Sequence, residues 1–198
     1  MNLDEIPAGA AVLIDANIAI YARRGMSAQC RRLFARCGKG ELRGAMTTVG
    51  VAEFCHRRMM QEAQSLGLCA SNPAKALGGN PALIARLSQY ARDVEDLLAG
   101  DLRILPVESG DLLAALPLQS QYQLLTNDSL HLAVGLRAGV AAFATSDPRF
   151  DSVRQILTDF RQPPVPAPPL LATPDPYRIH CIAPGNFMPT IGVGHWDE

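Results

Sequence analysis

Short apolar runs alternate along this chain with longer segments in which apolar residues recur every three or four positions. The runs at residues 10–14, 43–47, 102–107 and 140–145 have the length and composition of buried strands. The segments between them predict helices at residues 17–23, 27–37, 49–65, 81–98, 109–116 and 128–138. Strands that alternate with helices indicate an α/β fold with a mostly parallel sheet.

Capping residues support several of these boundaries. Ser27 stands where the second helix begins, and Gly38 stands where it ends. Pro81 lies in the first turn of the predicted helix 81–98, a position that tolerates proline. Residues 67–79 are small and polar, which predicts a break before that helix.

The composition changes at residue 162. Seven of the fourteen residues 163–176 are proline, which excludes a regular helix and favours an extended polyproline segment. We therefore predict a globular domain over residues 1–162 and a Pro-rich tail over residues 163–198, with a short strand at 177–182. Two interpretations of the tail stay open: a flexible terminus, or a strap that packs on the domain or on a second subunit.

The whole chain has the composition of a cytoplasmic protein with one core. It contains 198 residues, of which 48% are hydrophobic, enough for one sizeable domain. The five cysteines are odd in number and include no CxxC pair, which fits a reduced compartment better than a disulfide framework. The N-terminal residues do not resemble a signal peptide, and every apolar run is too short to span a membrane. We expect a cytoplasmic localisation and no membrane partner.

Four acidic residues stand where predicted elements begin or end: Asp15, Glu53, Asp128 and Asp147. Asp15 and Asp147 follow strands, and ligands of parallel sheets bind beyond the carboxyl ends of the strands. Acids at the rim of a core are costly to desolvate alone, so several together predict a shared cation. Oxygen ligands favour Mg²⁺ or Mn²⁺ over zinc, and such ions suit the hydrolysis of phosphodiester bonds.

Each acid also has an ordinary structural interpretation. Asp15 could cap a helix, Asp128 could favour a helix dipole, and Asp147 could belong to a turn. Glu53 is harder to dismiss, because a solitary carboxylate on an apolar helix face is costly. The four together favour catalysis.

Basic residues are concentrated in one part of the chain. Residues 21–58 hold nine of the 18 Lys and Arg residues against two acids, which is compatible with a phosphate backbone as partner. The predicted RNA contacts are Arg23, Arg24, Arg57, Arg58 and Arg149. Each of them could instead be a solubilising surface charge.

The segments LIDANIAIY, AEF, TNDSLHLAVGLRAGV and FATSDPRFD, in this order and spacing, resemble the PIN domain, the fold of VapC-type toxin ribonucleases. This resemblance covers residues 10–155 and implies a three-layer α/β/α sandwich. It places the four acids at the positions of the family's metal-binding residues. It also implies that Asn17 and Thr145 orient those acids and that Asp151 adds an outer contact.

For function, the resemblance implies a Mg²⁺- or Mn²⁺-dependent endoribonuclease that acts on RNA. It further implies a homodimer silenced by a small antitoxin protein, and hence the toxin of a toxin–antitoxin pair. The Pro-rich tail and the segment at residues 65–80 depart from the family pattern.

Other interpretations are weaker. A catalytically silent PIN-like module that binds RNA or protein is the main alternative, although it has no need of four repelling carboxylates. A dehalogenase-like phosphatase would require an aspartate at position 17, where this chain has Asn17, and no GxxxxGK[ST] loop is present. His131, three residues after Asp128, either approaches the metals or packs beside the core with one satisfied nitrogen, and we favour the second.

Overall fold

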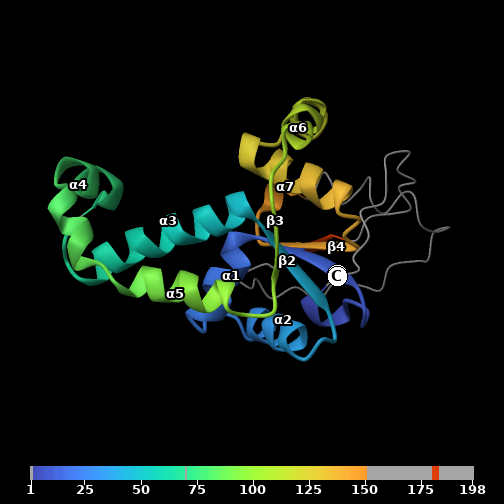
Figure 1. Cartoon of the computed structure of the whole chain (residues 1–198), viewed down its shortest axis with the longest axis horizontal. Coiled ribbons are helices and arrows are strands. Elements are labelled where there is room, and N and C mark those ends of the chain that lie inside the picture. Colours follow the sequence, from blue (N-terminus) through green and yellow to red (C-terminus); the bar gives the residue numbers. More distant parts are fainter. Residues whose placement is uncertain (1, 70, 151–179, 183–198) are drawn as a thin grey trace, which may run out of the picture.

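The central sheet has five strands in the order β3-β2-β1-β4-β5 (Figure 1). The computed structural model describes residues 2–69 and 71–150, and the backbone of residues 180–182. The strands are β1 (Ala11–Ile14), β2 (Arg43–Thr47), β3 (Arg103–Leu105), β4 (Ala142–Thr145) and β5 (His180–Ile182). The first four are parallel, and β5 pairs antiparallel with β4 at the edge. The predicted α/β class with a mostly parallel sheet is confirmed.

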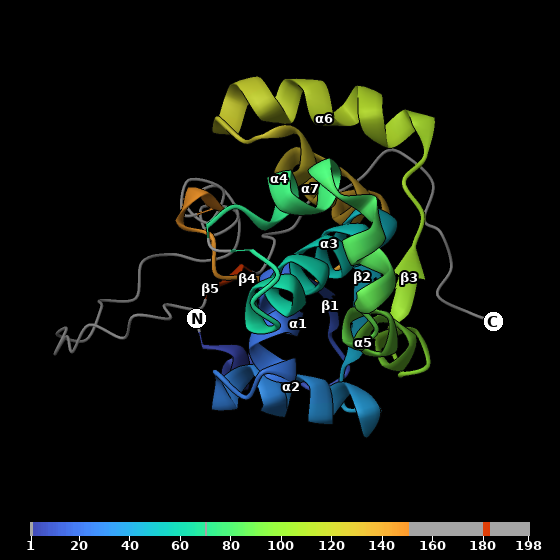
Figure 2. The same ribbon diagram turned by 90° about the vertical axis from the view of Figure 1, so that its left-hand side faces the viewer.

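Helices cover both faces of the sheet and complete a three-layer sandwich (Figures 1 and 2). The α-helices are α1 (Ala16–Arg23), α2 (Ala28–Gly38), α3 (Thr48–Ser65), α4 (Pro73–Gly79), α5 (Gln89–Leu98), α6 (Ser109–Tyr122) and α7 (Thr126–Arg137). Short 3₁₀ helices are η1 (Leu3–Glu5), η2 (Pro81–Arg86) and η3 (Pro148–Phe150). In the views of Figures 1 and 2, α1 and α2 lie on one side of the sheet, and α6 and α7 lie on the other.

The apolar runs of the sequence are continuous because the parallel strands are buried on both faces. In β1, Val12 and Ile14 belong to the core cluster that contains α1 and α2, whereas Leu13 belongs to the cluster that contains α7. The same alternation holds in β4, where Ala144 and Phe143 belong to opposite clusters. The parallel pairing of β1 with β4 places the carboxyl ends of these two buried strands side by side.

The predicted single helix over residues 81–98 is wrong. Residues 81–86 form the 3₁₀ helix η2, Leu87 is extended, and α5 begins at Gln89. The carboxylate of Glu62 on α3 accepts hydrogen bonds from the backbone N–H groups of Ser88, Gln89 and Tyr90, at 2.8–2.9 Å. Inside a continuous helix these N–H groups would donate to carbonyls of the preceding turn. Because they donate to the buried carboxylate instead, Glu62 stabilises a new helix N-terminus there.

Helix α6 is longer than predicted, because it continues through Pro117 to Tyr122. It is tied to α7 by Arg137, whose Nε and Nη2 donate to the buried carboxylate of Asp111 at 2.7 and 2.9 Å. Gln123 then takes a left-handed backbone conformation with φ of 55°, which turns the chain into α7. No helix of the described residues has both the length and the apolar character that a membrane span requires.

The strand predicted at residues 177–182 corresponds to β5. The rest of the predicted tail lies outside the described residues, so the domain division at residue 162 stays a prediction.

Candidate active site

Asp15 lies at the carboxyl end of β1, directly beside the carboxyl end of β4. The register pairs Ile14 with Ala144, and the N–H of Asp15 donates to the carbonyl of Ala144 at 2.9 Å. Asp15 is the N-cap residue of α1, but its side chain caps none of the described N–H groups. Its Oδ2 instead accepts a hydrogen bond from Thr145 Oγ1 at 2.9 Å. The carboxylate therefore points along the sheet edge and not into the helix.

The environment of Asp15 disfavours a charge. The residue is only 7% exposed, and burial raises the pKa of its carboxyl above the ordinary value, although the Thr145 hydrogen bond opposes this. Thr145 Oγ1 also accepts from the N–H of Asp147 at 3.1 Å, so one hydroxyl links two of the predicted acids. A nearby cation would offset the cost of ionising this buried acid.

Glu53 approaches Asp15 from the second turn of α3. Thr47 caps this helix, because its Oγ1 accepts from the N–H of Gly50 at 2.9 Å. Glu53 pairs with Arg57 one turn later, at 2.5 Å, and Arg57 Nη1 donates to Asn17 Oδ1 at 2.7 Å. His131 and then Arg57 lower the pKa of the Glu53 carboxyl, against the opposing effect of burial. Glu53 is thus held as an anion.

The predicted orienting role of Asn17 is consistent with its position. Its Nδ2 lies 3.4 Å from Asp15 Oδ2, and its Oδ1 accepts from Arg57. Asn17 therefore links the acid of β1 to the arginine of α3. Asp151, the third predicted orienting residue, lies outside the described residues.

Asp128 and Asp147 face the same space from the other side. Asp128 lies in the first turn of α7, and Asp147 follows β4. Arg149 pairs with both: its Nη2 lies 2.5 Å from Asp147 Oδ2, and its Nη1 lies 3.4 Å from Asp128 Oδ2. Burial raises the pKa of Asp128, whereas the hydrogen bonds from Arg149 lower the pKa of Asp147. Two acids that contact the same arginine therefore differ in how readily they ionise.

All four predicted acids line one pocket of about 350 Å³. Asn17, Arg57 and Arg149 line it as well, and residues 125–127 at the start of α7 complete the wall. The structure therefore brings together side chains that are separated by more than a hundred positions in the sequence. Two arginines already lie among the acids, so the pocket is not purely anionic.

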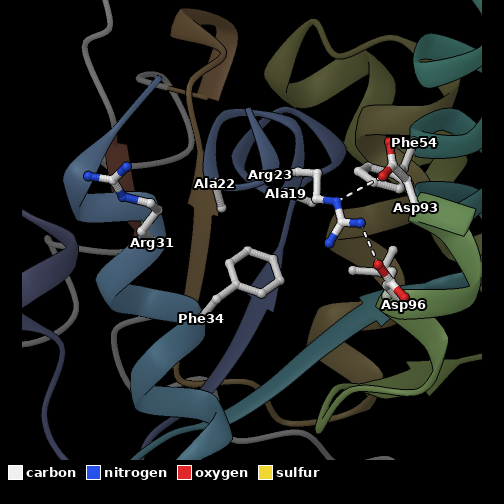
Figure 3. Close-up of a pocket in the computed structure, with 9 residues that line it drawn as sticks. Ala19, Ala22, Arg23, Arg31, Phe34, Phe54, Asp93 and Asp96 are labelled. Carbon is white, nitrogen blue, oxygen red and sulfur yellow. Dashed lines mark hydrogen bonds and ion pairs between the residues drawn. The ribbon is translucent and has the colours of Figure 1, made fainter. Parts of the chain in front are cut away.

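The other predicted RNA-contacting arginines lie elsewhere. Arg23 on α1 and Arg58 on α3 both pair with the buried Asp93 of α5, at 2.8 and 2.5 Å. Figure 3 shows Arg23 bonded to Asp93 and Asp96 in the lining of a mostly apolar pocket of about 340 Å³, which is separate from the acidic one. Arg24 is exposed at the C-terminal end of α1 and does not line the acidic pocket.

His131 is a site residue whose importance the sequence understated. Its side chain is 5% exposed, its Nδ1 lies 2.7 Å from Thr47 Oγ1, and its Nε2 lies 4.0 Å from Glu53 Oε2. His131 packs beside the core and has a partner for one ring nitrogen, as the favoured interpretation predicted. The second nitrogen, however, faces the acids. The only sequence signal was its spacing of three from Asp128, which places both on one helix face.

The donor set suits a divalent cation. One ligand atom from each of Asp15, Glu53 and His131 lies within 4.8 Å of the other two. Asp128 Oδ2 is buried and has no hydrogen-bond partner among the described residues. A buried carboxylate oxygen that pairs with Arg149 but accepts no hydrogen bond from the described residues, in a pocket with further carboxylates, suits oxygen-binding cations such as Mg²⁺ or Mn²⁺.

Three comparisons relate this chain to known proteins. Similar solved structures include a toxin–antitoxin complex from Klebsiella pneumoniae, with 16% identity and a TM-score of 0.47, covering 70% of this chain and 89% of that chain. Another is VapBC2 from Rickettsia felis bound to a DNA fragment from their promoter, with 11% identity and a TM-score of 0.49, covering 72% and 92% of the respective chains. No curated protein matches this chain. A family model, the PIN domain, matches residues 12–156. The chain belongs to the PIN domain family.

Proposed function

We propose that this protein is a metal-dependent endoribonuclease that hydrolyses phosphodiester bonds of RNA with Mg²⁺ or Mn²⁺. The observation that carries the proposal is the convergence of Asp15, Glu53, Asp128 and Asp147 on one pocket, where Asp128 Oδ2 is buried and accepts no hydrogen bond from the described residues. Four carboxylates share the pocket with two arginines, which leaves an excess of negative charge that a bound cation would offset.

The residues would divide the work as follows. The four carboxylates would hold the cation, and Asn17 and Thr145 would orient Asp15 through the contacts to its Oδ2. A bound divalent cation supplies a water of lowered pKa and neutralises charge on the phosphate. Arg57 and Arg149 line the pocket and are the arginines placed to contact the phosphates of a substrate.

The proposal includes the partners that the resemblance to VapC-type toxins implies. We propose a toxin that acts as a homodimer in the cytoplasm and is silenced by an antitoxin protein. Expression of the chain alone should arrest growth of a bacterial host, and an Asp15→Asn variant should not. If cells that express folded, active protein grow normally, the proposed role as a toxin is refuted, whereas the proposed nuclease activity is not.

The test of the nuclease is cleavage of a mixed RNA pool by purified protein with Mg²⁺ or Mn²⁺. Matched reactions contain EDTA, an Asp15→Asn variant, or a Glu95→Gln variant, in which an exposed acid of α5 outside the pocket is replaced. We expect cleavage by the wild type and by Glu95→Gln only, and a parallel reaction on single-stranded DNA tests the preference for RNA. Wild-type protein that binds RNA without cutting it, with or without metal, would support a silent binding module instead.

A further inference from the structure

His131 occupies an unusual position for a buried histidine. It lies on α7 with its ring 6.3 Å from that of Phe143, inside the apolar layer between sheet and helix. One ring nitrogen, Nδ1, contacts Thr47 Oγ1, whereas the other, Nε2, is buried without a hydrogen-bond partner among the described residues. An aromatic side chain would fill this space without leaving a polar atom unsatisfied. The imidazole therefore requires an explanation beyond packing.

The contacts of Thr47 favour one position for the ring proton of His131. Its hydroxyl oxygen already accepts the N–H of Gly50, and its hydroxyl proton then needs an acceptor. The nearest acceptor described is His131 Nδ1, at 2.7 Å. A hydroxyl that donates to Nδ1 leaves the proton of the neutral ring on Nε2.

The local packing holds this arrangement in place. Gly50 lies where a Cβ would stand 3.3 Å from Thr47 Oγ1 and 3.4 Å from His131 Cε1. Glycine is unfavourable inside a helix, but here it leaves room for the threonine and the imidazole to meet. The chain Gly50–Thr47–His131 thus joins the N-terminus of α3 to α7.

The Nε2–H that results faces Glu53 Oε2 at 4.0 Å. The other oxygen of Glu53, Oε1, is fixed by Arg57 at 2.5 Å. A small rotation of the carboxylate brings Oε2 within hydrogen-bond distance of Nε2. A protonated nitrogen has no lone pair for a metal, although His131 belongs to the group of residues close enough to hold one.

We propose that His131 is a positioning residue: its Nε2–H, fixed by the Gly50–Thr47 hydrogen-bond chain, orients the carboxylate of Glu53 and does not ligate metal. Ligating carboxylates depend on such partners, and their loss costs about 10- to 100-fold in metal affinity or activity. This role rests on the proposed function of the pocket, since Glu53 is the group that is oriented.

The first test needs no substitution and no nuclease activity. Two-bond ¹H–¹⁵N correlation spectra of ¹⁵N-labelled wild-type protein identify which nitrogen of His131 carries a proton, before and after Mg²⁺ is added. We expect a proton on Nε2 and none on Nδ1 in both states. A proton on Nδ1 in either state, or loss of the Nε2 proton on addition of Mg²⁺, would overturn the proposal in favour of metal ligation or a packing role.

Matched variants test the consequence. The amide nitrogen of His131→Gln reaches the place of Nε2, whereas that of His131→Asn reaches only the place of Nδ1. We expect His131→Gln to keep Mn²⁺ affinity and kcat within about 10-fold of wild type, and His131→Asn to lose about 10- to 100-fold in both with KM for RNA unchanged. Equal losses in the two variants, at equal thermal stability, would contradict the role.

These measurements separate two kinds of failure. Wild-type protein that cuts no RNA would refute the proposed function, but the nitrogen spectra and the Mn²⁺ affinities would still test the role of His131. Thr47→Val offers an independent check, because it removes the hydroxyl that fixes the ring while preserving the side-chain shape. We expect the nitrogen spectra of Thr47→Val to lose the single protonation pattern that we expect for the wild type.

Discussion

Asp128 has a buried carboxylate oxygen that accepts no hydrogen bond from the described residues, and burial raises its pKa despite the nearby Arg149. Asp128→Asn removes that charge with little change in shape. We expect RNA cleavage to fall by at least about 100-fold, because a cation loses a ligand. The melting temperature in EDTA should rise by about 2–4 °C, since the desolvated charge is absent. Glu95→Gln should change neither quantity, and an Asp128→Asn protein as active as wild type would exclude Asp128 from catalysis.

Arg149 is one of two arginines that act as counter-ions in this pocket, and it competes for the oxygens that a metal would use. Its guanidinium contacts both Asp147 and Asp128. We expect Arg149→Gln to tighten Mn²⁺ binding by roughly 10-fold at low ionic strength, because the acids lose a neighbouring positive charge. Isothermal titration calorimetry measures the change, and Arg92→Gln, an exposed arginine of α5 outside the pocket, serves as its control. Unchanged affinity would contradict this competition, because Arg149 would then leave the acids without a cost in free energy when metal binds.

At the scale of elements, Asp93 joins three helices. Its carboxylate on α5 receives hydrogen bonds from Arg23 of α1 and Arg58 of α3, at 2.8 and 2.7 Å, and its side chain is 1% exposed. Burial alone would raise the pKa of Asp93, but the hydrogen bonds from Gln89, Arg58 and Arg23 outweigh it and hold the pKa below the ordinary value. The acid therefore stabilises the fold in its ionised form.

Replacement of Asp93 tests this link through its pH dependence. A lowered folded-state pKa gives stability that is fully present above the unfolded pKa, near about 4, and is lost as pH falls through the folded value. We expect Asp93→Asn to lower the free energy of unfolding by about 3 kcal/mol at pH 7, and by progressively less as the pH falls through the lowered pKa of Asp93. Urea unfolding over a series of pH values measures the difference. Asp96→Asn is the matched control: its side chain is 58% exposed and pairs with the same Arg23, so it should cost less than about 1 kcal/mol.

How much the sequence predicts depends on the range of the interaction. Asp15 was predictable, because a strand ends directly before it and the ends of parallel strands share one edge. The pairing of Arg23 with Asp93 was not, because the two residues are 70 positions apart and Arg23 has the sequence context of an exposed helix end. The break before α5 depends in the same way on Glu62, which lies 26 positions earlier than Ser88. The sequence thus predicts the ends of buried strands well, but not which distant partner each charge finds.

At the scale of the whole molecule, α6 forms an outer layer over α7 (Figure 2). Four leucines on α6 and at the start of α7 are 52–71% exposed: Leu112, Leu113, Leu116 and Leu125. Helix α6 contains no Lys or Arg, and its one acid, Asp111, is buried against Arg137. A second copy of this face can therefore approach without repulsion between like charges, which makes α6 the surface we assign to the proposed homodimer.

Leu125 also lines the acidic pocket, so a dimer built on this face places the second copy beside the mouth of each site. We expect wild-type protein to sediment as a dimer at micromolar concentration, and the double variant Leu113→Lys, Leu116→Lys to sediment as a monomer with its fold intact. Because the partner would border the pocket without contributing an acid to it, the monomer should bind Mn²⁺ as tightly as wild type but show a higher KM for RNA. The double variant Leu66→Lys, Leu98→Lys, which changes two exposed leucines elsewhere, should remain dimeric and active. A wild-type monomer at these concentrations, or a dimer that survives both lysines of α6, would place the contact between copies on another face.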